Sequence, residues 1–172
     1  MTAITLQKYT LSQKFILRTM SKLDPTHLGI LRLLQEDARM THKELARRLR
    51  KSVSPIFERV KWLEQNGYIK GYTALVDLQK SSNSIISYTH IQMNDHSEEA
   101  LSAFQREVVL FEDVRECYYI TGNFDFILKI VSPDMKGYND FLRGQLSKLP
   151  NVGSVQSFLV LSEEKRDTTY KI

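Results

Sequence analysis

Hydrophobic residues in the first half of the chain recur at helical spacing, and residues typical of helix ends bracket them. Asp24 followed by Pro25 predicts a helix start, because an acidic N-cap and a proline suit the first turn. Apolar positions at helical spacing continue to about Asp37. Thr41, with Glu44 three residues later, has the spacing of a capping box and predicts a second, short helix.

A third helix is predicted to open near Ser52 or Ser54, with Pro55 in its first turn and Gly67 just past its end. On a helical wheel the predicted buried face holds Val53, Ile56, Phe57, Val60 and Leu63. The predicted outer face holds Ser54, Glu58, Lys61, Trp62 and Gln65, with Arg59 at its edge. The core shared by the three helices is expected to contain Leu28, Leu31, Leu34, Leu45, Leu49, Val60 and Leu63.

The second and third helices have the pattern of a helix-turn-helix, whose second helix enters the DNA major groove. Taken alone, two such helices are more often an ordinary amphipathic pair with a solvated face. The rest of the chain, however, favours the helix-turn-helix interpretation.

After Gly67 the periodicity changes from helix to strand. Residues 68–76 are aromatic and β-branched and are interpreted as extended, and the polar residues 77–84 as a hinge. Strands are predicted at 85–93, 114–120, 124–131 and 152–161, with 168–172 a candidate for a short fifth. Helices are predicted after Ser97 and after Ser132-Pro133-Asp134.

This order, β-α-β-β-α-β, predicts an α+β protein whose second part is a ferredoxin-like domain. Its four antiparallel strands would carry two helices on one face and leave the other face free to pair with a second copy. The expected organisation is an extension over 1–22, a winged-helix-like helix-turn-helix domain over 23–70, a linker strand and hinge over 71–84, and a second domain over 85–172.

Charge is distributed unevenly along the chain, whose net charge is +4. Residues 1–70 carry 14 Lys or Arg against 6 Asp or Glu, whereas residues 71–172 carry 10 against 14. A basic half favours a polyanionic partner. An anionic membrane is the alternative, but the basic face lacks a free apolar face for lipid. The single cysteine, Cys117, together with the lack of a signal peptide or membrane-spanning run, favours a reducing cytoplasm.

The sequence contains none of the nucleotide-binding, nucleophile-elbow or zinc-protease motifs that carry catalytic chemistry. The histidines His27, His42, His90 and His96 fall on different predicted elements, which disfavours a metal site. We therefore expect no catalytic residue, no metal and no cofactor. Cys117 is expected to be a small core residue.

Short segments along residues 23–172 together resemble the Lrp/AsnC, or feast/famine, regulators. These segments are Leu23-Asp24, Ile30-Leu31 with Leu34, Leu45-Ala46, ERVKWLE at 58–64, GYIKGY at 67–72, TGNFDF at 121–126 followed by Leu128, and LPNV at 149–152. Each segment is a weak signal, but their order and spacing are specific.

The resemblance implies an operator-binding helix-turn-helix followed by a ligand-sensing domain, the RAM domain. It implies dimers that often assemble into octamers, and a small effector, commonly an amino acid, bound between dimers. The candidate DNA-binding residues are Arg50, Lys51, Ser52, Ser54, Glu58, Arg59 and Lys61. The loop that matches the effector pocket supplies Thr121, Gly122, Asn123, Phe124 and Asp125.

Four positions depart from the family pattern. Arg50 and Lys51 stand where relatives usually have glycine and leucine, Trp62 stands at an outward position that is often basic, and Asn123 stands where an acid is common. Asp125 has two interpretations: it bonds turn amides after Gly122, or it meets an effector's ammonium group.

Three classes of function remain after these arguments. The preferred class is an effector-responsive transcription regulator that acts on double-stranded DNA. The second is an architectural DNA-binding protein without an effector. The third, a ferredoxin-like metabolite-binding or catalytic domain with a helical appendage, is opposed by the basic first half.

Overall fold

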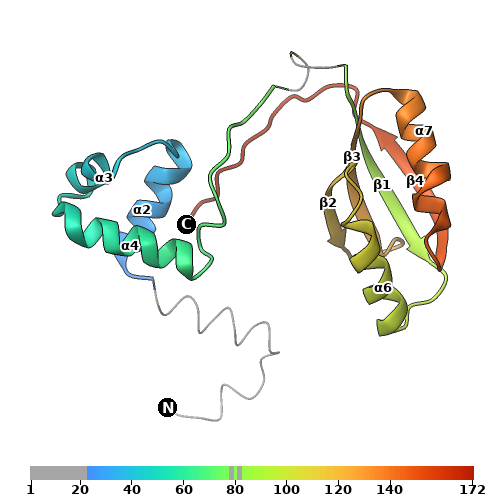
Figure 1. The fold of residues 1–172 in the computed structure, drawn as a ribbon, viewed down its shortest axis with the longest axis horizontal. Coiled ribbons are helices and arrows are strands. Elements are labelled where there is room, and N and C mark those ends of the chain that lie inside the picture. Colours follow the sequence, from blue (N-terminus) through green and yellow to red (C-terminus); the bar gives the residue numbers. More distant parts are fainter. Residues whose placement is uncertain (1–22, 78–79, 81–82) are drawn as a thin grey trace, which may run out of the picture. The chain divides into compact units, whose positions relative to one another are not determined.

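The computed structural model describes residues 23–77, 80 and 83–172, so the predicted extension over 1–22 lies outside the described residues. The chain divides into two compact units, which are described separately (Figure 1). The helical unit contains the described residues up to Ala74 together with Arg166–Ile172, and the sheet unit contains Leu75–Lys165.

The helical unit is built from α2 (Pro25–Glu36), α3 (His42–Leu49) and α4 (Val53–Gln65). The predicted start of α2 is confirmed, since Asp24 accepts the His27 N–H at 2.8 Å and its own N–H donates to His27 Nδ1 at 3.2 Å. Thr41 caps α3 by accepting the Glu44 N–H, but the Glu44 side chain bonds arginines instead of closing a capping box. The fully buried core consists of Ile30, Leu45, Ala46, Ile56, Val60 and Leu63.

Two predictions for the faces of α4 were wrong. Val53 and Phe57 were expected on the buried face of α4, but they are 45% and 46% exposed. Trp62 was expected to point outward, but it is half-buried and packs between the rings of His27 and Tyr68. The core closes around Ile56, Val60 and Leu63, one narrow stripe of α4, and this leaves the flanks of the helix to other contacts.

The segment that follows α4 is not a strand. Gly67 has a positive φ of 73° just past the helix, as predicted, and Tyr68 N–H bonds the Leu63 carbonyl at 2.9 Å to close the end. Residues 69–77 have no strand partner among the described residues. Tyr72 donates its hydroxyl to Glu64 at 2.9 Å, and burial with this bond raises the Tyr72 pKa to about 12.

The last residues of the chain lie against α2, where a short fifth strand was expected. Gln35 donates to the Tyr170 carbonyl at 3.2 Å and accepts the Tyr170 N–H at 2.7 Å, so one amide side chain brackets one residue of the tail. Arg32 Nε donates to the Ile172 carbonyl at 2.5 Å. The tail has no strand partner among the described residues, and its bonds to α2 go to side chains.

The sheet unit contains β1 (Ile85–Met93), β2 (Val114–Tyr119), β3 (Phe126–Ser132) and β4 (Val152–Leu159). Their order in the sheet is β2-β3-β1-β4 and all neighbours are antiparallel, which confirms the ferredoxin-like prediction. Helices α6 (Glu98–Val108) and α7 (Met135–Gly144) begin at the caps Ser97 and Asp134, and the 3-10 helix η2 covers Leu146–Lys148.

Side chains on one sheet face pack with α6 and α7, and the other face includes exposed aromatic side chains. The buried cluster holds Ile91, Met93, Phe104, Val108, Phe126, Leu128, Ile130, Tyr138, Phe141 and Leu146. Cys117 packs against this cluster as predicted, and burial raises the pKa of its thiol. On the opposite face, Tyr88, Tyr118 and Phe158 are 38%, 52% and 49% exposed.

Candidate functional site

The connection between α3 and α4 is a tight turn held by backbone bonds. Arg50 has φ 53° and ψ 48°, a left-handed conformation that glycine adopts most easily. The Arg50 N–H bonds the Arg47 carbonyl at 3.3 Å and the Lys51 N–H bonds the Ala46 carbonyl at 2.9 Å. This pair of bonds is a Schellman motif. The turn therefore forms although arginine and lysine replace the glycine and leucine that the resemblance led us to expect.

The first two turns of α4 present a mixed polar and apolar surface. Ser52 is the N-cap but makes no side-chain cap bond, and Ser54 and Glu58 are exposed. Val53 and Phe57 lie on the same surface, and the His42 ring of α3 meets the Phe57 ring edge-on at 5.3 Å. Serine, glutamate and apolar groups are thus available together at the start of this helix.

Arg59, predicted to contact DNA from the edge of α4, is held within the helical unit. Its Nη2 donates to Asp24 Oδ2 at 2.8 Å, and its buried Nε has no hydrogen-bond partner among the described residues. The Arg59 bond, followed by the His27 N–H bond and the nearby positive charge, lowers the Asp24 pKa to about 2 against the cost of desolvation. The main contact of Arg59 therefore connects α4 to the start of α2.

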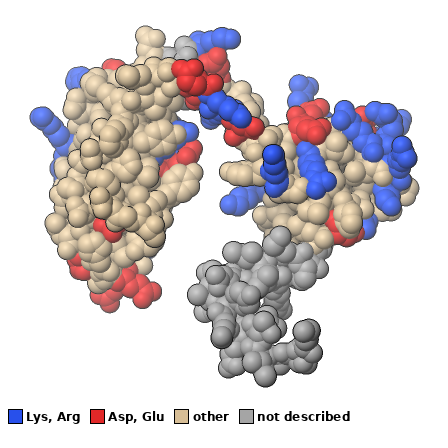
Figure 2. All heavy atoms as spheres, turned by 180° about the vertical axis from the view of Figure 1, so that it is seen from behind, with Lys and Arg blue, Asp and Glu red and all other residues tan. Residues whose placement is uncertain are grey.

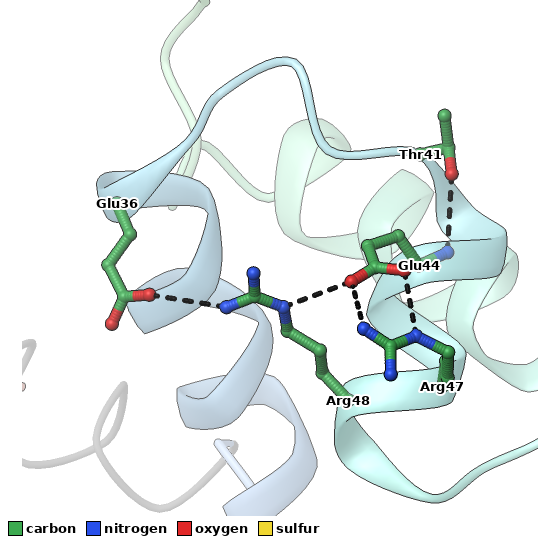
Figure 3. A network of polar contacts seen from close by, with 5 residues as sticks. All are labelled: Glu36, Thr41, Glu44, Arg47 and Arg48. Atoms are coloured by element: carbon green, nitrogen blue, oxygen red, sulfur yellow. Dashed lines mark hydrogen bonds and ion pairs between the residues drawn. The ribbon is translucent and has the colours of Figure 1, made fainter.

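Two arginines of α3 are also engaged, in the network drawn in Figure 3. Glu44 accepts two hydrogen bonds from Arg47, at 2.6 and 2.9 Å, and one from Arg48 at 3.1 Å. Arg48 also lies 3.7 Å from Glu36 of α2. The Arg47 bond, then the Arg48 bond, lower the Glu44 pKa to about 2. Glu44 consequently stays ionised and offsets part of the positive charge of α3.

Part of the positive charge that remains uncompensated flanks the first turns of α4. Figure 2 shows Lys and Arg side chains gathered over the helical unit, where residues 23–70 carry ten Lys or Arg against six Asp or Glu. Within the described part of the chain, no ion pair holds Arg50, Lys51 or Lys61, and all three are exposed. These cations precede and follow the exposed first turns of α4, as phosphate-contacting groups would need to.

The second candidate site is the loop between β2 and β3. Thr121, Gly122 and Asn123 are exposed, and Gly122 has φ 122°, which a side chain would strain although a Cβ there would meet no atom within 4 Å. Phe124 packs against the His90 ring of β1 at 5.2 Å. The loop therefore offers exposed backbone at its tip and anchored side chains at its base.

Asp125 anchors the base of this loop. Its backbone bonds Ile91 and Ile120, and its Oδ2 accepts the Met93 N–H at 2.7 Å. His96 Nε2 lies 3.1 Å from Asp125 Oδ1 and 3.2 Å from Oδ2. Of the two interpretations of Asp125, the one in which it bonds turn amides after Gly122 was wrong: its carboxylate bonds the end of β1 and the segment before α6.

Two parts of the chain each match a known protein family. Residues 23–70 match a winged helix-turn-helix DNA-binding family, and residues 87–170 match the Lrp/AsnC ligand binding domain. The leucine-responsive regulatory proteins of Escherichia coli and Salmonella typhimurium are 35% identical over 144 residues, which cover 84% of this chain and 88% of each relative. This chain belongs to the Lrp/AsnC family. It is a DNA-binding transcriptional regulator with a ligand-binding domain.

Solved Lrp/AsnC structures share the fold. A transcriptional regulator from Neisseria meningitidis, solved as a complex with L-Met, has 30% identity and a TM-score of 0.78, with 87% of this chain and 97% of that chain covered. An AsnC family regulator from Agrobacterium tumefaciens has the same four values. No helix among the described residues has the length and apolar character needed to cross a membrane.

Some residues of this Lrp/AsnC chain emerge only from the structure. His96 and Met93 were not associated with the effector loop, because a contact between the end of a strand and a loop about thirty residues away leaves no local pattern. Phe57 was assigned to the core because periodicity gives the face of a helix and not the width of its buried stripe. The charge of Arg50 and Lys51, by contrast, was visible in the sequence.

Proposed function

We propose that this regulator binds duplex DNA through the first turns of α4, pairs through its exposed sheet face and responds to an amino acid at the 121–125 loop. This proposal rests on the exposed α4 surface between Arg50, Lys51 and Lys61, three cations that no ion pair holds within the part of the chain that the structure describes. Ser52, Ser54 and Glu58 would contact base edges or phosphates from the same surface. Arg59 would act chiefly by holding α4 against α2.

Pairing would occur between copies of the sheet unit. Tyr88, Tyr118 and Phe158 expose aromatic surface on the face that α6 and α7 leave open, and aromatic groups are enriched in protein interfaces. A two-fold axis through such a pair would present two α4 helices to successive major grooves of a pseudo-palindromic site. Dimers would associate further, to an octamer. Light scattering that gave a monomer mass at micromolar concentration would refute this part.

The effector is proposed to be an amino acid, in line with the related Neisseria regulator solved with L-Met. The N–H groups near Gly122 would receive its carboxylate, next to Thr121, Asn123 and Phe124. Asp125 would receive its ammonium group. Because Asp125 already bonds Met93 and His96, the ammonium group would take the place of His96, whose side chain is 59% exposed.

The effector would change DNA binding only as far as it binds one assembly state better than another. The protein would act in the cytoplasm, where operator DNA is available, and we assign it no catalytic step, cofactor or metal.

Calorimetry of the full chain against the L-amino acids, starting with L-Met, tests the effector. We expect saturable heat for at least one of them and a large loss of affinity in Asp125→Asn. Glu99→Gln, which removes an exposed carboxylate from the same unit, serves as the control and should bind normally. Absence of heat for all amino acids, with DNA binding intact, would favour the effector-independent architectural function.

A further inference from the structure

Two apolar side chains are exposed on the part of α4 that carries the DNA-binding candidates. Val53 is 45% exposed and Phe57 is 46% exposed. They stand four residues apart in the first two turns, so they lie on one face of the helix, next to the exposed Ser54. The core of the helical unit is complete without them, because Ile56, Val60 and Leu63 fill it from α4.

Phe57 is also held in place from the preceding helix. The His42 ring packs edge-on against it, with ring centroids 5.3 Å apart and planes at 84°. An aromatic pair of this geometry restricts the ring while leaving nearly half of the side chain open to a ligand. A role in packing α3 against α4 accounts for the covered half of Phe57 and leaves the exposed half unexplained.

The neighbouring charges indicate what covers this surface. Arg50 and Lys51 precede it and Lys61 follows it one turn later, and all three are exposed cations suited to phosphates. If these cations contact phosphates, the apolar patch between them would face the base edges of the groove. In the major groove the apolar group on those edges is the 5-methyl group of thymine.

We propose that Phe57 and Val53 determine sequence specificity by packing against thymine methyl groups in the major groove. This inference rests on the proposed use of α4 as the DNA-reading helix. It adds a property that phosphate and hydrogen-bond contacts do not provide: loss of affinity when a methyl group is removed and every hydrogen-bonding group of the base is kept.

The test uses the full chain and a duplex selected by it from a random pool. Each thymine of the selected duplex is replaced in turn by deoxyuridine, which lacks only the methyl group. At one or two positions of each half-site we expect about a four-fold loss of wild-type affinity, the equivalent of one methyl-sized group returned to water. In Phe57→Ala or Val53→Ala the loss at the matching position should disappear, as in a double-mutant cycle.

Lys61→Ala is the matched comparison, since it should weaken binding to all duplexes and keep the deoxyuridine penalty unchanged. The wild-type scan needs no variant, so a folding defect in Phe57→Ala does not remove the test. A wild type that is indifferent to every methyl group, or penalties that persist in both alanine variants, would overturn this inference alone. Failure to select any duplex would overturn it together with the proposed DNA-binding surface.

Discussion

Arg59 of α4 donates a hydrogen bond to Asp24 at 2.8 Å, and the same carboxylate caps α2 through the His27 N–H. One side chain thus fixes the start of one helix and the middle of another. The arginine lowers the Asp24 pKa to about 2, so the pair is ionised at neutral pH. This link stabilises the α4 orientation on which DNA reading would depend.

The two functions of Asp24 can be separated by substitution. Asp24→Ala should lower the free energy of unfolding of the helical unit by about 1–2 kcal/mol, mostly through the lost cap. The ion pair adds a smaller part, because the Asp24 side chain is 40% exposed and its pair is screened by solvent. Asp24→Asn keeps a capping oxygen and should cost less than about 1 kcal/mol. Urea unfolding followed by fluorescence of Trp62, the single tryptophan, measures both.

The ion pair between Asp24 and Arg59 predicts that the stability of the helical unit decreases in acid. The folded pKa of about 2 lies below the value of about 3.9 expected for an unfolded aspartate. Stability from Asp24 is therefore fully present above about pH 4 and is lost as the pH falls toward 2. Asp24→Asn should lack this part of the acid dependence. Identical acid unfolding curves for the two proteins would contradict the assignment.

The parts of the fold that local chemistry determines could be predicted from the sequence. Asp24-Pro25, Ser97 and Asp134 begin helices and Gly67 follows one, because caps and left-handed residues act within a few residues of the chain. Individual side-chain contacts between distant segments, unlike the strand order of the sheet, could not be predicted. The two hydrogen bonds between Gln35 and Tyr170 join residues 135 positions apart, and no periodicity in the sequence indicates them.

Some features of the candidate sites could likewise be predicted from the sequence, and others depend on distant contacts. The charge of Arg50, Lys51 and Lys61 was evident from composition, and their exposure supports the proposed role. Arg59 has the same charge but is held by Asp24, a partner 35 positions away. A wheel assigns residues to faces, so it could not tell that the core stripe of α4 is narrow enough to leave Phe57 exposed.

Arg50 is predicted to oppose stability and favour DNA binding. Arg50→Gly should raise the free energy of unfolding by about 0.5–1 kcal/mol, because glycine adopts the left-handed φ of 53° without strain. It should also weaken DNA binding through the lost charge. Arg50→Lys is the control, since it keeps both the charge and the strain and should change neither property much. A glycine variant of unchanged stability would show that the turn is not strained.

Salt dependence tests the electrostatic part of DNA binding. The logarithm of the affinity should fall linearly with the logarithm of salt concentration, and Lys51→Ala or Lys61→Ala should each reduce the slope by about 0.9. Ser54→Ala should instead change the preference among sequences and keep the slope. Fluorescence anisotropy over a salt series measures these slopes. Affinity that is insensitive to salt would rule out phosphate contacts by these lysines.

The C-terminal tail should be held by Gln35. Gln35→Ala removes both bonds to Tyr170, so the Tyr170 amide should exchange its hydrogen faster while global stability changes by less than about 0.5 kcal/mol. Gln65→Ala, which removes the same side chain from the exposed end of α4, should leave that exchange rate unchanged. Hydrogen exchange followed by NMR measures these rates. Equal Tyr170 exchange rates in wild type and both variants would show that Gln35 does not hold Tyr170.

Asp125 and His96 should contribute very differently to the sheet unit. Asp125→Ala leaves the Met93 N–H without its acceptor, and because Asp125 is only 15% exposed this should cost about 1–3 kcal/mol of stability. His96→Ala removes an exposed partner and should cost less than about 1 kcal/mol.

If an effector's ammonium group takes the place of His96, then His96→Ala should bind that effector at least as tightly as wild type. Thermal unfolding with and without the amino acid compares the variants. Tighter binding in His96→Ala with none in Asp125→Asn would support a carboxylate shared between loop and effector, whereas full ligand response in a folded Asp125→Asn would leave Asp125 a purely structural anchor.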